Sequence, residues 1–176
     1  MPKPRKMLGS ADASYIVALM RLIETQSKIT LANWCLDYAE AQILPIYEKA
    51  YPEDARCKNA LDAARDWMAG KVKFPEVKKI ILHECHAAAR EAEDHPAAQA
   101  AARTCGQASA CIHTPTHALG LAFYGAAAIA YDRVGIAEPP EVYEQIAAEE
   151  CGKMLAALQA MAVENEPNPA KINWNC

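Results

Sequence analysis

Four of the five histidines occur as two close pairs, His83 with His86 and His113 with His117. Imidazoles one helical turn apart can share a metal ion. The run from His83 to His86 resembles the zinc-protease signature, but it is one residue shorter than the spacing that this signature needs. A metal site made by all four histidines is therefore an alternative. The interpretation that we favour is that they satisfy helix ends and line a polar seam.

Carboxylates offer a second chemistry. Asp37, Glu40 and Glu84 could meet between helices, but di-iron bundles use a Glu-x-x-His spacing, and Glu84 lies only two residues before His86. The chain has no Gly-rich phosphate loop and no Gly-x-Ser-x-Gly elbow, and Cys85 is more typical of packing than of a nucleophile. The sequence therefore favours a protein without a cofactor or a catalytic centre.

Charged residues on Ala-rich segments indicate structural ion pairs. Asp37, Arg65, Arg90 and Arg103 lie on or beside such segments, and a charge that becomes buried needs a partner. We expect a buried polar network of Asp37, Arg65 and Arg103. In this network Asp37 pairs with one of the two arginines and sets the helix register.

The elements that position these residues should be helices, because alanine is abundant and strong β-formers are sparse. Residues 97–131 are mostly small and carry no charge after Arg103, which is typical of a buried helical hairpin with Gln107 and His117 among its polar interruptions. We expect an all-α, single-domain bundle of about seven helices around this Ala-rich central hairpin. Its parts are a disordered N-terminus at 1–9, the helical domain at 10–164 and an extended tail at 165–176.

Helical spacing and helix-start residues predict the seven helices. They lie at about 10–25, 31–50, 55–69, 75–93, 96–112, 115–134 and 140–164. The expected N-caps are Ser10 or Asp12, then Thr30, then Asp54. Pro45 should kink the second helix because it removes a backbone donor.

Two details of this pattern concern the histidines. The apolar stripe of the fourth helix includes Ile81 and Glu84, which leaves His83 and His86 outside it. Thr114-Pro115 either kinks one long helix or begins a new one with Thr114 as the N-cap. We favour a new helix, because a capping residue followed by proline is a start signal.

Charge and cysteine content narrow the function classes. The formal net charge of -4 argues against nucleic acid or an anionic membrane as the partner. No apolar run is long enough to span a membrane, and the run from Ala13 to Met20 is too short for a signal peptide. Seven cysteines without a Cys-x-x-Cys motif fit reduced core thiols in the cytoplasm, with Cys176 as an exposed free thiol. Residues 138–166 carry seven glutamates and one lysine, which we expect to form a solvated face.

Five ordered segments carry a resemblance to a known family. They are Leu31 to Glu40 with Leu44-Pro45, Ala60 to Trp67, His86 to Ala92, Ala101 to Arg103 with Gly106 to Ala108, and His113 to Ala118. Together they resemble the small all-helical immunity proteins associated with bacterial polymorphic toxin systems, over about residues 28–165.

The resemblance implies a cytoplasmic protein that binds and neutralises a cognate toxin without catalysis. A basic toxin would associate quickly with this acidic protein through electrostatic steering. The residues favoured for partner contact are Arg65, Trp67, His86, Arg90, His113 and His117, and the acidic helix at 140–164 is the other candidate surface. The competing classes are a metal-binding protein or enzyme that uses a histidine and carboxylate seam between the fourth, fifth and sixth helices, and a homo-oligomer joined through an apolar helix face.

Overall fold

The computed structural model of the protein describes residues 4–175. All regular secondary structure in this part of the chain is helical, and it contains no strand. The all-α expectation is therefore confirmed. Three short π- or 3-10-helical segments continue neighbouring α-helices, so the described residues form seven helical rods. The rods are α1 (Ser14–Ile23), α2–η1–α3 (Lys28–Tyr38, Ala39–Ile43, Leu44–Ala50), α4 (Arg56–Met68), α5–η2–α6 (Phe74–Ile80, Ile81–Cys85, His86–Glu91), α7 (Pro96–Ala110), η3–α8 (Pro115–His117, Ala118–Val134) and α9 (Pro140–Met161).

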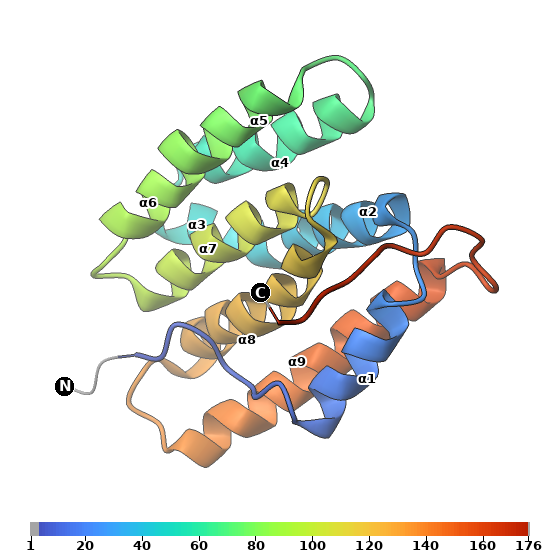
Figure 1. Ribbon diagram of the computed structural model, residues 1–176. Coiled ribbons are helices and arrows are strands. Elements are labelled where there is room, and N and C mark those ends of the chain that lie inside the picture. The colour runs from blue at the N-terminus through green and yellow to red at the C-terminus, as the bar shows by residue number, and fades with distance from the viewer. Residues whose placement is uncertain (1–3, 176) are drawn as a thin grey trace.

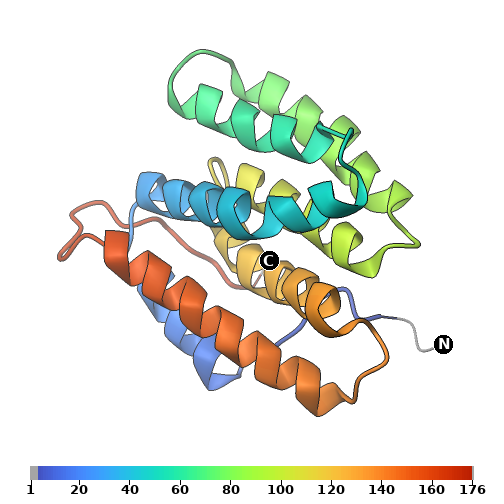
Figure 2. The ribbon, with the colours of Figure 1, turned by 180° about the vertical axis from the view of Figure 1, so that it is seen from behind.

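The rods are stacked in layers around α7 (Figure 1). One side is formed by α4 and the α5–η2–α6 rod, the middle by α7, α8 and the α2–η1–α3 rod, and the other side by α1 and α9, which Figure 2 shows from behind. Because α7 packs on α2, α3, α4, α6 and α8, it is the centre of the molecule. None of the helices described in residues 4–175 combines the length and the apolar character that crossing a membrane requires.

The expected central hairpin is formed by α7 and α8, which pack on each other more extensively than any other two helices of the described chain. The chain turns after Ala110 and restarts at Pro115, whose missing N–H suits a first helical position. The structure thus has two helices here and not one kinked helix. The new helix opens as a 3-10 turn, in which the N–H of His117 donates to the carbonyl of Thr114 at 3.0 Å, while the Thr114 side chain makes no cap.

The winding of the second rod changes just before Pro45. The N–H of Leu44 donates to the carbonyl of Ala39, five residues back, so the turn before Pro45 is a widened π turn. Proline explains this, because it has no N–H to give and its ring crowds the preceding turn. The rod also begins earlier than expected. Ser27 is its N-cap and accepts the N–H of Thr30 at 3.2 Å, so Thr30 lies inside the helix.

A second π turn, η2, interrupts the fourth rod without a proline. The N–H of His86 donates to the carbonyl of Ile81, again five residues back. The extra residue rotates the following helix by about 100°. The core position expected for Glu84 is consequently taken by Cys85, which is fully buried, and Glu84 is partly exposed. The expected stripe is therefore wrong at this turn.

Both terminal segments pack on the bundle. Leu8 is 1 % exposed and its N–H donates to the carbonyl of Phe123 at 3.1 Å, so the expectation of disorder is wrong for residues 4–9. The described part of the tail after α9 contains no helix, and the N–H of Ala170 donates to the carbonyl of Gln26 at 2.8 Å. Residues 1–3 and Cys176, which the sequence suggested to be an exposed thiol, lie outside the described residues.

Helix caps at the other starts differ in part from the expectation. No side chain caps α1, because the Ser10 hydroxyl bonds to Asp12 and not to the helix. Asp54 does serve the start of α4, where its Oδ1 accepts the N–H of Arg56 at 3.0 Å, although Ala55 holds the N-cap position.

Candidate functional site

A polar seam runs between α6, α7 and the start of α8, and its members are His86, Gln107 and His117. The Nδ1–H of His117 donates to Oε1 of Gln107 at 2.7 Å, because an amide oxygen can only accept. His86 on α6 packs its ring against α7 at Gly106. All three side chains are half-buried, so the seam joins three helices and has one edge open to solvent.

Two glycines make this seam possible. A Cβ atom on Gly106 would lie 2.9 Å from Cε1 of His86, and one on Gly120 would lie 2.6 Å from Oε1 and 2.8 Å from Cγ of Gln107. Real Cβ atoms do not approach heavy atoms so closely. The His86 ring therefore rests on the α7 backbone and the Gln107 amide on the α8 backbone, which lets the helices come close together.

The seam holds neutral imidazoles. Burial lowers the pKa of both His86 and His117 below the ordinary value, and the nearby charge of Arg90 adds to this effect at His86. Such rings can donate and accept hydrogen bonds. The four histidines are not brought together as a metal site, and among residues 4–175 no group of three or more His, Cys, Asp or Glu side chains is placed to hold a metal ion.

His113 belongs to an aromatic cluster outside the seam. Its ring stacks on Phe74 with centroids 4.1 Å apart and planes 17° apart, and Phe74 meets Trp67 edge-on at 6.2 Å. We call Trp67, Phe74 and His113 the aromatic patch. His113 is exposed and the other two rings are half-buried. The sequence did not predict the position of Phe74 in this patch, because nothing along the chain links the residue before Pro75 to a loop about 40 residues away.

Arg65 joins α4 to the second rod at the surface. Its Nη2 donates to Asp37 at 2.9 Å and to Glu40 at 2.7 Å. The expected pairing of Asp37 with Arg65 is present, but the pair is not buried, because the side chains of Arg65 and Asp37 are 35 % and 59 % exposed. Arg103 takes no part in it. The buried network of Asp37, Arg65 and Arg103 is therefore not what the structure contains.

Among residues 4–175, the buried charged side chain is Glu150 on α9. The side chain of Glu150 is 4 % exposed and accepts hydrogen bonds from Arg133 at 2.6 Å and from Lys153 at 2.7 Å. The neighbouring Glu149 also pairs with Lys153, at 3.0 Å, and Glu144 accepts the hydroxyl of Tyr15. Much of the acidic face of α9 is thus engaged within the protein, which reduces its value as a contact surface.

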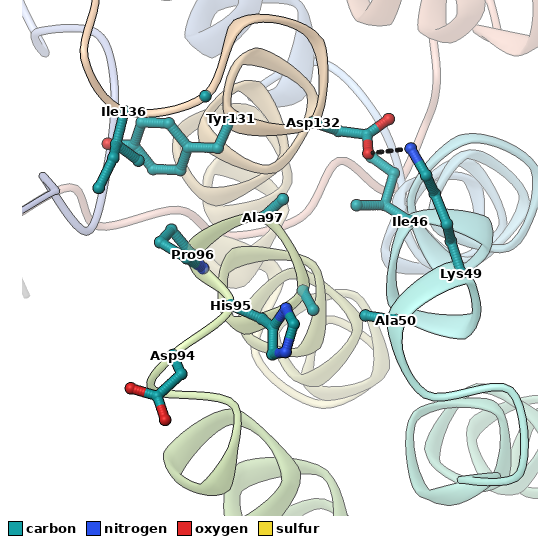
Figure 3. Close-up of a pocket in the computed structure, with 12 residues that line it drawn as sticks. Ile46, Lys49, Ala50, Asp94, His95, Pro96, Ala97, Tyr131, Asp132 and Ile136 are labelled. Carbon is teal, nitrogen blue, oxygen red and sulfur yellow. Dashed lines mark hydrogen bonds and ion pairs between the residues drawn. The ribbon is translucent and has the colours of Figure 1, made fainter.

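Arg90 and Arg103 lie together beside the N-terminal segment, where they line a hollow of about 520 Å³. A second hollow, of about 390 Å³, lies between α3, the start of α7 and the end of α8. Figure 3 shows Lys49 and Asp132 paired across its rim and His95 between α7 and Ala50. The second hollow is mostly apolar, and it contains none of the residues that the sequence selected.

The six residues selected from the sequence therefore fall in four places. Arg65 is in a surface ion pair, Trp67 and His113 are in the aromatic patch, His86 and His117 are in the seam, and Arg90 lines the first hollow.

The fold and the seam define an all-helical bundle in which the polar groups mainly join helices. Aromatic and cationic side chains lie at its surface. The family described as Imm-5 like putative immunity protein matches residues 21–157, and the chain belongs to this family. The resemblance found in the sequence is thus confirmed. Searches of the curated proteins and of the solved structures give no match.

Proposed function

We propose that this protein binds a cognate bacterial toxin in the cytoplasm and neutralises it as a stoichiometric, non-catalytic inhibitor. Membership of an immunity-protein family over residues 21–157 is the observation that carries this proposal. The arrangement of the polar groups supports it. The histidines of the seam hold helices together, and a rigid scaffold of this kind binds with little loss of conformational freedom.

The aromatic patch is the contact surface that we favour. Trp67, Phe74 and His113 come from three separate elements and fix one another in place. Partly exposed, preorganised aromatic side chains are typical anchors of protein interfaces. In contrast, Arg65, His86 and His117 already have partners or close packing within the chain. With a net charge of -4, the protein would attract a basic toxin from a distance.

Co-expression with the toxin encoded by a neighbouring gene tests the proposal. We expect the protein to relieve growth arrest and to form a 1:1 complex with the toxin in calorimetry. The variants Trp67→Ala and His113→Ala should each weaken binding by about tenfold or more, which is the scale of an interface anchor. Arg21→Ala, at an exposed position on α1, is the matched control and should bind as the wild type does.

Recovery of the toxin separates inhibition from catalysis. A stoichiometric inhibitor leaves the toxin covalently unchanged, so toxin refolded after denaturing the complex should regain its activity and its original mass. Failure to bind any neighbouring toxin would refute the proposed function. A toxin that stays altered in mass after separation would refute the non-catalytic mechanism.

A further inference from the structure

The hollow beside the N-terminal segment is lined mainly by positive charge. Its cations are Arg5 and Lys6 from the segment before α1, Arg90 from α6 and Arg103 from α7. We call the hollow that these four residues line the cationic hollow. Glu93 is the one carboxylate among the residues that line it. This concentration of cations is unexpected in a protein whose formal net charge is -4.

The four cations differ in their pairing from several arginines elsewhere in the described chain. Across residues 4–175, none of them forms an ion pair, whereas Arg56, Arg65 and Arg133 each pair with carboxylates. Arg103 is half-buried, and this burial lowers its pKa. A charge removed from water without a counter-ion costs free energy. Arg103 is therefore held in a place that suits an anion supplied from outside.

The walls of the hollow are fixed in position. The hydroxyl of Tyr131 donates to the carbonyl of Arg5 at 2.7 Å, and Leu8 anchors the same segment through its bond to Phe123. Between the other two walls, Nε2 of Gln99 on α7 donates to the carbonyl of Ala89 on α6 at 2.9 Å. The segment is thus bonded to α8, α6 is bonded to α7, and α8 packs on α7, so the cations sit on a connected framework.

We propose that the cationic hollow is a binding site for a small anionic ligand that carries two or more phosphate or carboxylate groups. Arginine is suited to these groups because its planar fork can bond two oxygens at once. The volume of about 520 Å³ falls in the range of small-molecule sites. Four cations from three elements exceed what a single monoanion needs. This inference does not depend on the proposed toxin.

Calorimetry with the full chain and two probes, inorganic pyrophosphate and citrate, tests the site. The titrations are made at low ionic strength, where screening is weakest. We expect saturable 1:1 binding of at least one probe, and the better probe identifies phosphate or carboxylate as the preferred group. Arg103→Gln and Arg90→Gln should each lower the affinity by about tenfold or more, the scale of a lost charged hydrogen bond.

The control is Arg21→Gln, which removes an exposed arginine of α1 outside the hollow and should leave the affinity unchanged. Circular dichroism verifies that each variant is folded, and the bound probe should raise the melting temperature of the wild type more than that of Arg103→Gln. The proposal is wrong if neither probe binds saturably, or if Arg21→Gln loses as much affinity as Arg103→Gln.

Discussion

At the scale of single residues, burial decides which charged side chains contribute to the stability of the fold. Arg65, Asp37 and Glu40 form a short-range surface cluster whose members stay in contact with water. Exposed pairs of this kind contribute little to stability. Glu150 is different, because its carboxylate is almost fully buried and two cations reach it from the side that faces solvent. Removal of that carboxylate leaves Arg133 and Lys153 paired only with the exposed Glu149.

We therefore predict that Glu150→Gln lowers the free energy of unfolding by about 1–3 kcal/mol, less than for a fully buried ion pair because both cations remain about half exposed. Urea denaturation at neutral pH measures the change. Glu149→Gln, one residue earlier with a 52 % exposed side chain, is the matched control and should differ little from the wild type. Equal effects of the two variants would show that the burial of Glu150 does not increase its contribution to the free energy of unfolding.

The neutral histidines of the seam predict a dependence on pH. Burial lowers the pKa of His86 and His117 in the folded protein, while the unfolded imidazoles titrate near the ordinary value of 6.5. Below 6.5 the unfolded chain therefore binds more protons than the native one, and stability decreases as the pH falls. The urea midpoint should decrease between about pH 7.5 and pH 5.5.

A His117→Gln variant should lose part of this pH dependence, whereas His83→Gln, at an exposed position of η2, should retain it. Carboxylates titrate at lower pH than these histidines. Hydrogen bonds from Arg56 hold the pKa of Asp54 at about 2 in the folded protein, below the ordinary value of 3.8. The stability that the ionised Asp54 carboxylate contributes is therefore lost only as the pH falls below 3.8. A midpoint that stays constant from neutral pH to pH 5.5 would contradict the assignment of neutral histidines.

At the scale of the elements, the contact between α7 and α8 depends on a glycine. Gln107 lies flat against the α8 backbone at Gly120, and the same amide accepts the hydrogen bond of His117. A methyl group at Gly120 would collide with Cγ and Oε1 of Gln107. Relief of that collision requires Gln107 to move away, and the hydrogen bond to His117 would be lost with it.

Gly120→Ala should therefore destabilise the protein by about 1–3 kcal/mol, as overpacking of a close contact does. Gly152→Ala on α9 is the matched substitution, because its new methyl group would meet nothing within 4 Å. There the higher helix propensity of alanine should stabilise the protein by up to about 1 kcal/mol. Thermal melts of the two variants should thus shift in opposite directions, and a shift in the same direction would refute this account of the α7–α8 contact.

The elements differ in how well the sequence predicts them, for identifiable reasons. Proline and capping residues act locally, so the restart at Pro115 and the part that Asp54 takes at the start of α4 could be predicted from the chain. The π turn before His86 has no local signal. It shifts Cys85 into the core, where its thiol donates to the carbonyl of Ala102 at 3.2 Å, and it turns His86 towards α7.

In the candidate site, too, features that depend on local sequence could be predicted and features that depend on distant residues could not. Gln107 and His117 stood out as polar residues in an apolar hairpin, and the histidines were predicted to line a polar seam. Phe74 and the buried position of Glu150 depend on residues that are distant along the chain, such as His113 and Arg133. A glutamate on a Glu-rich helix is usually solvated. Only the packing of α8 on α9 reveals that this one is enclosed.

At the scale of the whole molecule, the core is built from close-packed helices with many small side chains. Six cysteines are buried in it. Five of them lie in five different rods, in both the central and outer layers, and Cys111 directly follows α7. Burial raises the pKa of Cys35, and it raises that of Cys151 to about 12. Since the thiolate is the reactive form, these groups combine poor access with a small reactive fraction. Their reactivity therefore reports on the integrity of the whole fold.

We predict that a Cys176→Ser variant, which removes the one cysteine outside the described residues, reacts with no equivalent of Ellman's reagent while it is native and with six equivalents in concentrated guanidinium chloride. The protection should be lost in one step, together with the helical circular dichroism signal, because the thiols belong to one continuous core. The measurement is a thiol titration across the denaturant range. Rapid labelling of one thiol in the native protein would show that its helix opens separately from the core, and the sequenced labelled peptide would identify which helix it is.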